Sequence, residues 1–171
     1  VIENWSPFIK PKVSKIQYYK RKLNPLNKFC FIYSGTLGYK HNTDLFISIA
    51  MKFPKAIQII SSKGKFANAL KKKAIRESLN IKVINWINYN ELSSFLSIAD
   101  ALIVTLENDA SAFSVPSKIY NYLTIRKPIL ASMPADNIGS KKIKKMQVGY
   151  VSKPENINAF LNHSRLIIQS K

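Results

Sequence analysis

The sequence has little cysteine, few acidic residues and no long apolar run, and each shortage excludes a class of protein. Its single cysteine, Cys30, cannot form an internal disulfide, and no set of side chains has the spacing of a metal site. No apolar run approaches the roughly 18–20 residues that span a bilayer. The first residues lack the basic flank and apolar stretch of a signal peptide. We therefore expect a metal-free cytoplasmic domain.

Acidic residues are scarce relative to basic ones: 9 Asp and Glu stand against 27 Lys and Arg, a net charge of +18. Such an excess is typical of proteins that bind nucleic acid or an anionic membrane surface. Only four of the basic residues are Arg, the residue whose fork-shaped side chain reads base edges. This composition weakens the nucleic-acid interpretation, which stays open as an alternative.

Apolar residues make up 46% of the 171 residues, which is enough for one domain of ordinary size. Short apolar runs, rich in Ile, Val and aromatic residues, recur along the chain and are typical of buried strands. The six runs are Phe29–Tyr33, Ala56–Ser61, Lys82–Trp86, Ala101–Thr105, Pro128–Ala131 and Gly149–Val151.

Between these runs, apolar residues recur at spacings of three and four, which predicts amphipathic helices. Ser152–Glu155 has the pattern of a capping box for the last of them. Strands that alternate with helices form parallel sheets covered on both faces. We therefore expect an α/β fold, a Rossmann-like three-layer sandwich with a parallel sheet of about six strands.

Residues 1–28 do not follow this alternation. They contain three prolines, and Lys10–Lys28 carries seven basic residues and no acidic one. We expect 1–28 to be a hinge or linker with one short helix, and 29–171 to be the folded domain. Since the first residue is Val rather than Met, we also expect a piece of a longer or processed protein.

The loops that leave the strands are where ligands bind in an open parallel sheet. The first loop, Ser34–Asn42, contains Gly35 and Gly38, which let a ligand approach the backbone, and it leads into a helix whose N–H groups favour anions. Lys40 and His41 add donors, so the loop suits a phosphate or diphosphate. The alternative is that the glycines serve a tight turn and Lys40 is solvated.

The second loop runs from Ser111 into the helix that begins near Ser117. Lys118 at a helix N-terminus is unfavourable to the helix dipole unless it faces an anion, and Asn121 lies about one turn further on. The alternative is a helix cap followed by a surface lysine. After the third strand, Trp86–Asn90 offers aromatic surface to a base, or Trp86 is simply a core residue.

Other conspicuous residues favour structural roles. The lysine runs Lys71–Lys73 and Lys141–Lys145 are typical of solvated helix faces. His163 and Cys30 are typical of residues with a packing role rather than a catalytic one. No Ser/His/Asp arrangement and no close carboxylate pair can be assembled.

Six segments, in order, resemble a known family. Tyr33–Asn42 is similar to its "Y-S-G-N-L-G-x-K-H-N" loop, and Val115–Leu123 to its "x-P-S-K-x-Y-E-Y-M" segment. The other four are Val1–Trp5 ("V-I-P-N-W"), Glu91–Leu102 (an "E-L" followed by "A-D"), Arg126–Ala131 ("G-R-P-V-L-A") and Gly149–Glu155 (a "G-x-V" closing on "P-E"). Together they resemble the C-terminal, donor-binding half of a GT-B glycosyltransferase in retaining family 4, the group 1 glycosyltransferases.

The resemblance implies a site for a nucleoside-diphosphate sugar. It places the diphosphate at Gly35, Thr36, Gly38, Lys40, His41, Ser117 and Lys118. It places the nucleoside at Trp86, Ile87, Asn88 and Asn121.

The chain departs from the family pattern at two positions. Asn121 stands where the family often has a Glu that holds the ribose, and Phe113 where it has an earlier Glu near the donor sugar. Asp109 is a candidate to replace that second carboxylate. Retaining members have no accepted protein nucleophile, so the resemblance assigns no catalytic residue, and we expect no metal or other cofactor.

The function implied is transfer of a sugar to a glycan or lipid-linked acceptor in surface polysaccharide synthesis. We expect the N-terminal acceptor domain of the family to be absent from this chain, and the chain therefore to bind nucleotide and to transfer little by itself. Its net charge of +18 suggests attachment to an anionic membrane surface at the cytoplasmic face. The alternatives are a nucleic-acid-binding α/β domain and a non-catalytic sugar-nucleotide-binding module.

Overall fold

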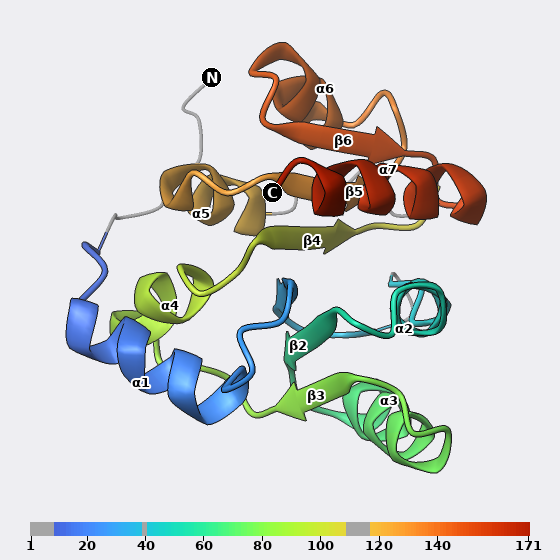
Figure 1. Cartoon of the computed structure of the whole chain (residues 1–171). Helices are drawn as coiled ribbons and strands as arrows, with labels where there is room; N and C mark the ends of the chain where they lie inside the picture. The colour runs from blue at the N-terminus through green and yellow to red at the C-terminus, as the bar shows by residue number, and fades with distance from the viewer. Residues whose placement is uncertain (1–8, 39–40, 109–116) are drawn as a thin grey trace.

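The computed structural model describes residues 9–38, 41–108 and 117–171, in which helices and strands alternate after an initial helix (Figure 1). The strands are β1 (Cys30–Ser34), β2 (Ile57–Ser61), β3 (Ile81–Ile84), β4 (Ala101–Thr105), β5 (Ile129–Ser132) and β6 (Gly149–Ser152). The helices are α1 (Val13–Leu23), α2 (Asp44–Lys52), α3 (Lys65–Arg76), α4 (Tyr89–Leu96), α5 (Lys118–Ile125), α6 (Ile138–Lys145) and α7 (Ile157–Gln169).

The strands form one parallel sheet in the order β3-β2-β1-β4-β5-β6. This confirms the expected α/β, Rossmann-like fold. The chain builds outward from β1 in one direction and, from β4, in the other. The carboxyl ends of β1 and β4 therefore flank the crevice where open α/β sheets bind ligands.

Each face of the sheet has its own apolar core. Because strand residues alternate in direction, Ile32 and Leu102 face one side while Phe31 and Ile103 face the other. Helices α1, α4, α5 and α6 cover the first side, and α2, α3 and α7 the second (Figure 1). This double covering explains why the strands are near-continuous apolar runs.

Helix α1 lies within the segment expected to be a hinge, and it packs on α4. Tyr19 and Leu23 are buried in the core, and the Tyr19 ring meets Phe95 edge-on at 5.5 Å. The Lys15 ammonium lies 2.6 Å from the Glu91 carboxylate. This part of the segment therefore belongs to the packed structure, while the domain boundary at residue 28 stays a prediction.

The predicted capping box at Ser152–Glu155 is wrong. Ser152 pairs with Ser132 in the sheet, which keeps its backbone extended. Its hydroxyl shares a 2.9 Å hydrogen bond with Nδ1 of His163 instead of capping a helix. Helix α7 starts later, and the side chain of Asn156 accepts a 2.9 Å hydrogen bond from the backbone N–H of Ala159.

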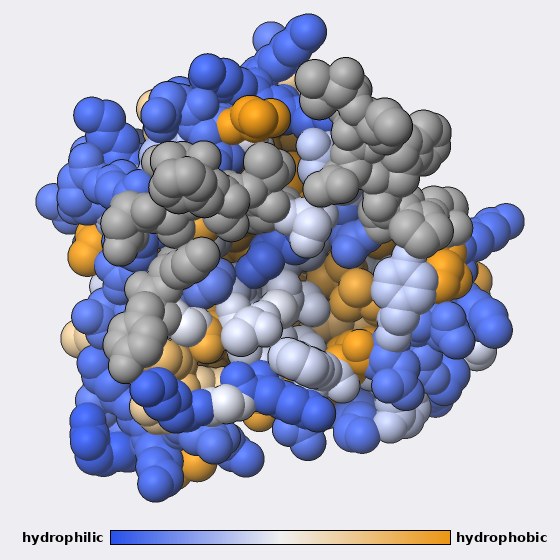
Figure 2. Space-filling model, turned by 180° about the vertical axis from the view of Figure 1, so that it is seen from behind, coloured by the Kyte–Doolittle hydropathy of each residue, from blue (hydrophilic) through white to orange (hydrophobic). Residues whose placement is uncertain are grey.

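The surface is predominantly hydrophilic around the rim of the face in Figure 2, with apolar residues between the polar ones toward its centre. The lysines of both runs are exposed or half-buried on α3 and α6, as expected of solvated helix faces. None of the described helices is long and apolar enough to cross a membrane.

Candidate functional site

The loop that leaves β1 is fastened to the neighbouring strand β2. The Gly35 N–H donates to the carbonyl of Ser61 at 3.0 Å, and the Leu37 N–H donates to the hydroxyl of Ser62 at 3.1 Å. Gly35 has a φ of +141°, which L side chains rarely adopt. The glycine predicted from the sequence is thus required by the backbone.

The second half of the loop closes on itself at His41. The Gly38 N–H donates to Nδ1 of His41 at 3.2 Å, and the His41 N–H donates to the Gly38 carbonyl at 3.0 Å. A Cβ at Gly38 would meet nothing within 4 Å, so space lies in front of it. Thr36 is exposed on the same loop. Lys40, the other predicted donor here, lies outside the described residues.

Lys118, the first residue of α5, reaches across to this loop. Its Nζ donates to the Tyr33 hydroxyl at 2.8 Å and lies 4.0 Å from the centre of the Tyr33 ring. A Cβ at Gly35 would lie only 2.9 Å from Nζ. Gly35 therefore does two things: it adopts the positive φ, and it leaves room for the ammonium.

The ammonium of Lys118 sits in an environment that disfavours its charge. The residue as a whole is half-buried, and burial of the ammonium lowers the pKa of Lys118 to about 7. Burial also raises the pKa of Tyr33 well above its ordinary value, so this phenol stays neutral. An anionic ligand at this position would favour the protonated amine and would itself be stabilised by it.

Helix α5 presents its N-terminus at the same place. Ser117 is its N-cap residue and is exposed, with no capping hydrogen bond from its side chain. Further along the helix, Tyr122 accepts a 3.0 Å hydrogen bond from the N–H of Ser34, which ties α5 to the end of β1. The helix dipole and Lys118 therefore both favour negative charge beside the glycine loop.

The predicted nucleoside segment lies after β3, two strands away from β1. Trp86 is 52% exposed, so the alternative that it is a core residue is wrong; β3 ends at Ile84, before the tryptophan. The Lys63 ammonium lies 5.0 Å from the Trp86 ring centre. Ile87 packs against the core, and Asn88 is the exposed N-cap residue of α4.

The structure thus brings Gly35 and Lys118 into contact and places Gly38 and His41 on the same loop. Asn121 is half-buried on α5, and its carbonyl accepts from Thr124 at 2.7 Å. The candidate sugar contacts, Asp109 and Phe113, lie outside the described residues.

Tyr33 and Lys63 belong to the site region but were not assigned to it from the sequence. Tyr33 lies inside an apolar run, where the pattern indicates only a core residue. The signal that could have found it is its place one residue before the end of a strand that leads into a glycine loop.

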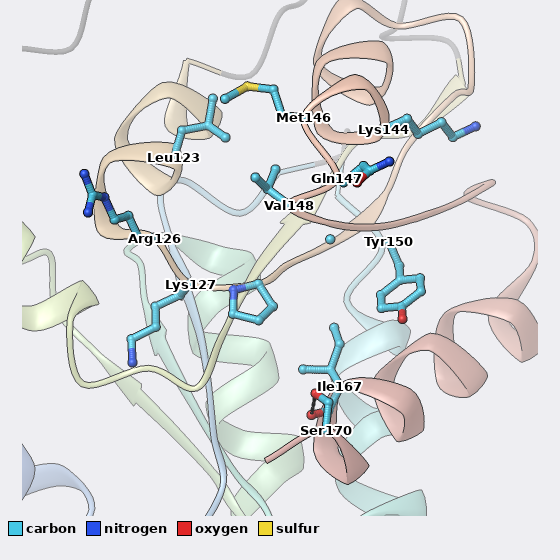
Figure 3. A pocket seen from close by; sticks show the side chains of 12 residues that line it. Leu123, Arg126, Lys127, Lys144, Met146, Gln147, Val148, Tyr150, Ile167 and Ser170 are labelled. Carbon is cyan, nitrogen blue, oxygen red and sulfur yellow. Dashed lines mark hydrogen bonds between the residues drawn. The ribbon is translucent and has the colours of Figure 1, made fainter.

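Two further features of the described residues concern the binding of ligands. No group of three His, Cys, Asp or Glu side chains among them could hold a metal ion. A cavity of about 850 Å³ lies at the opposite edge of the sheet, where β5 and β6 begin, and includes Arg126, Lys127 and Tyr150 in its lining (Figure 3).

Comparison with known protein families shows to which of them the chain is related. The profile described as "Glycosyl transferases group 1" matches residues 15–171, which is most of the chain. The chain belongs to the group 1 glycosyltransferases. No curated protein sequence matches it significantly.

Solved structures similar to this group 1 glycosyltransferase domain confirm its fold. Anabaena HepE in complex with UDP-glucose superposes with a TM-score of 0.74 at 16% identity, covering 95% of this chain and 45% of HepE. Sucrose-phosphate synthase from Thermosynechococcus elongatus gives 0.74 at 14% identity, with 94% and 41% covered. UDP-GlcNAc 2-epimerase from Neisseria meningitidis, bound to UDP-GlcNAc, gives 0.63 at 13% identity, with 92% and 42% covered. The chain spans less than half the length of each of these proteins.

Proposed function

We propose that this chain is the donor-binding part of a retaining glycosyltransferase that moves a sugar from a nucleoside diphosphate to a glycan or lipid-linked acceptor in surface polysaccharide synthesis. The observation that carries the proposal is the position of the Lys118 ammonium, which donates to Tyr33 of β1 and fills the space beside Gly35 at the crevice between β1 and β4. Membership of the group 1 family and the likeness to HepE, whose structure contains UDP-glucose, support a nucleoside-diphosphate sugar as donor.

The proposed chemistry is stabilisation of a leaving group. When the bond between the sugar and the diphosphate breaks, negative charge develops on the diphosphate oxygens. Lys118 and the N-terminus of α5 lie where they would stabilise that charge as it forms. Lys40, a residue of the predicted diphosphate loop, is proposed to add a second ammonium. No metal ion is part of this proposal, and the acceptor and its base would come from an N-terminal half.

The nucleoside is proposed to lie toward β3. The exposed indole of Trp86 offers a stacking surface, and Asn88 and Asn121 offer hydrogen-bonding groups for the base and ribose. Lys63 already lies over the Trp86 ring and would have to share or leave that surface when a base stacks there.

A peripheral location at an anionic membrane is proposed as well. The charge of +18 is carried in part by exposed lysines on α3 and α6, Lys71, Lys72, Lys144 and Lys145 among them. Such residues each contribute about 1 kcal/mol of attraction near an anionic bilayer. An enzyme that elongates lipid-linked acceptors works at such a surface.

Calorimetric titration with UDP, GDP and ADP tests the donor proposal. We expect at least one of them to bind, and Lys118→Ala to weaken that binding about tenfold or more, because a charge-assisted contact to phosphate is lost. The matched control is Lys22→Ala, because Lys22 also donates to a tyrosine hydroxyl, that of Tyr18, but on the exposed face of α1. Absence of binding at millimolar nucleotide, or equal binding by Lys118→Ala, would contradict the proposal.

A further inference from the structure

The hydroxyl of Tyr33 joins three parts of the site. It accepts a 2.8 Å hydrogen bond from Nζ of Lys118 on α5, and it donates a 2.9 Å hydrogen bond to the carbonyl of Thr36 in the glycine loop. The tyrosine itself belongs to β1. One phenol oxygen therefore links the strand, the loop and the helix that surround the expected diphosphate.

The position of this hydroxyl is set by the core. Tyr33 is 0% exposed, and its ring packs edge-on against Phe46 at 5.3 Å and against His41 at 6.1 Å. Nζ of Lys118 lies 4.0 Å from the ring centre, within the range of a cation–π contact. A flexible lysine is thus held by a rigid ring before any ligand arrives.

We propose that Tyr33 is a positioning residue that holds the Lys118 ammonium against the glycine loop for contact with the donor diphosphate. An ammonium has three N–H donors, of which Tyr33 accepts one, so phosphate oxygens can bind the others without breaking the pair. This preorganisation lowers the entropy lost on binding. The inference rests on the proposed function, since it assigns Tyr33 a role in that same site.

The pair has a consequence for pH dependence. The titratable groups around Lys118 in the described site are Tyr33 from β1, Tyr122 on α5 itself, and His41 on the loop, whose ring meets that of Tyr33. Both tyrosines have pKa values raised by burial, so they stay neutral near pH 7. Loss of the Tyr33 hydroxyl removes an acceptor from the ammonium and should lower the pKa of Lys118 further.

The variant Tyr33→Phe tests the proposal, because it keeps the ring and removes the hydroxyl. Inorganic pyrophosphate and the nucleoside diphosphate that binds wild type most tightly are titrated from pH 6 to 9. We expect about tenfold weaker binding of both at pH 8, with the fall in affinity starting at lower pH than in wild type. Tyr18→Phe, which removes the exposed lysine partner on α1, is the matched control and should behave as wild type.

Carbon-13 labelling of the lysine Cε atoms gives a readout on the wild-type chain, independent of whether Tyr33→Phe folds. The signal that disappears from the spectrum of the Lys118→Arg variant is assigned to Lys118. That signal should be shifted upfield by the Tyr33 ring and titrate far below the other lysines. A Lys118 signal with ordinary shift and titration overturns the inference, as does Tyr33→Phe binding that is unchanged or weakened equally at every pH. Failure of wild type to bind any nucleotide would instead overturn the proposed function.

Discussion

Gly35 lies where any larger residue would collide with the ammonium of Lys118. Its φ of +141° adds backbone strain for any residue with a Cβ. We therefore expect Gly35→Ala to lower the free energy of unfolding by about 1–3 kcal/mol and to weaken nucleotide binding. Chemical denaturation and calorimetry measure the two effects.

Gly38 provides the control for stability, because it is not among the positive-φ glycines and a Cβ there would meet open space. Gly38→Ala should leave the free energy of unfolding unchanged or slightly raised. Equal destabilisation by both substitutions would show that neither the positive φ nor the neighbouring Lys118 ammonium makes Gly35 a special position.

The lowered pKa of Lys118 predicts a pH dependence of stability. The folded-state pKa is about 7 and the ordinary value is 10.5, so between them the unfolded chain binds more protons. Raising the pH from about 7 toward 10 should therefore stabilise wild type relative to Lys118→Met. Above pH 10 the buried tyrosines lower the stability of both proteins, because their raised pKa values keep them protonated in the folded chain while the unfolded chain loses those protons. This effect is common to wild type and Lys118→Met.

Urea denaturation of wild type and Lys118→Met at pH 6, 7, 8, 9 and 10 measures this difference. The difference in unfolding free energy should change little from pH 6 to 7 and then steadily in favour of wild type up to pH 10. A difference independent of pH would mean that Lys118 keeps its ordinary pKa in the folded chain.

At the residue scale, the sequence predicted Lys118 and Gly35 but not what connects them. Lys118 could be found because a lysine at a helix N-terminus conflicts with the helix dipole, which indicates an anion. Tyr33 could not, because a tyrosine in an apolar run is read as core, and its hydroxyl contacts depend on loops far apart in sequence. Exposure of Trp86 was likewise undecidable, since it depends on β3 ending two residues earlier.

At the scale of elements, helix α1 contributes to the folded core although its amino-acid composition does not indicate this. Its basic, proline-flanked sequence suggests a linker, but Leu23 is buried in the core. Leu23→Ala should lower the free energy of unfolding by about 2–5 kcal/mol. Val13→Ala on the same helix, where the side chain is 69% exposed, should change it by no more than about 0.5 kcal/mol. Thermal or urea unfolding in which both variants match wild type would show that α1 is not part of the cooperative fold.

The strands were the elements best predicted from the sequence. β4 has the predicted bounds, because its five residues are all buried and the apolar run has clear limits. The start of α7 was misplaced, because the pattern Ser152–Glu155 satisfies a local capping rule while pairing with β5 keeps Ser152 in the sheet. Local signals specify that an element exists; the tertiary partner decides where it ends.

At the scale of the whole molecule, the net charge of +18 predicts binding to anionic surfaces. Co-sedimentation with vesicles should rise with the fraction of anionic lipid and fall with salt. Lys71→Glu with Lys72→Glu should reduce it, because both exposed lysines lie on α3. Vesicle binding that does not depend on the fraction of anionic lipid would contradict the membrane proposal.

The arrangement of the sheet is what gives the site its place. The order of strands puts the ends of β1 and β4 side by side, and this brings the glycine loop to the N-terminus of α5 although they are some eighty residues apart in the chain. The alternating pattern of strands and helices was enough to predict this edge as the binding edge.

A crystal structure of the chain with the nucleoside diphosphate that binds most tightly tests the central claim most directly. The account predicts the diphosphate between Gly35–Gly38 and the N-terminus of α5, with a phosphate oxygen within hydrogen-bonding distance of Nζ of Lys118, and the base toward Trp86. A nucleotide bound elsewhere, for example in the cavity beside Arg126 and Tyr150, with Lys118 contacting no phosphate, would contradict it.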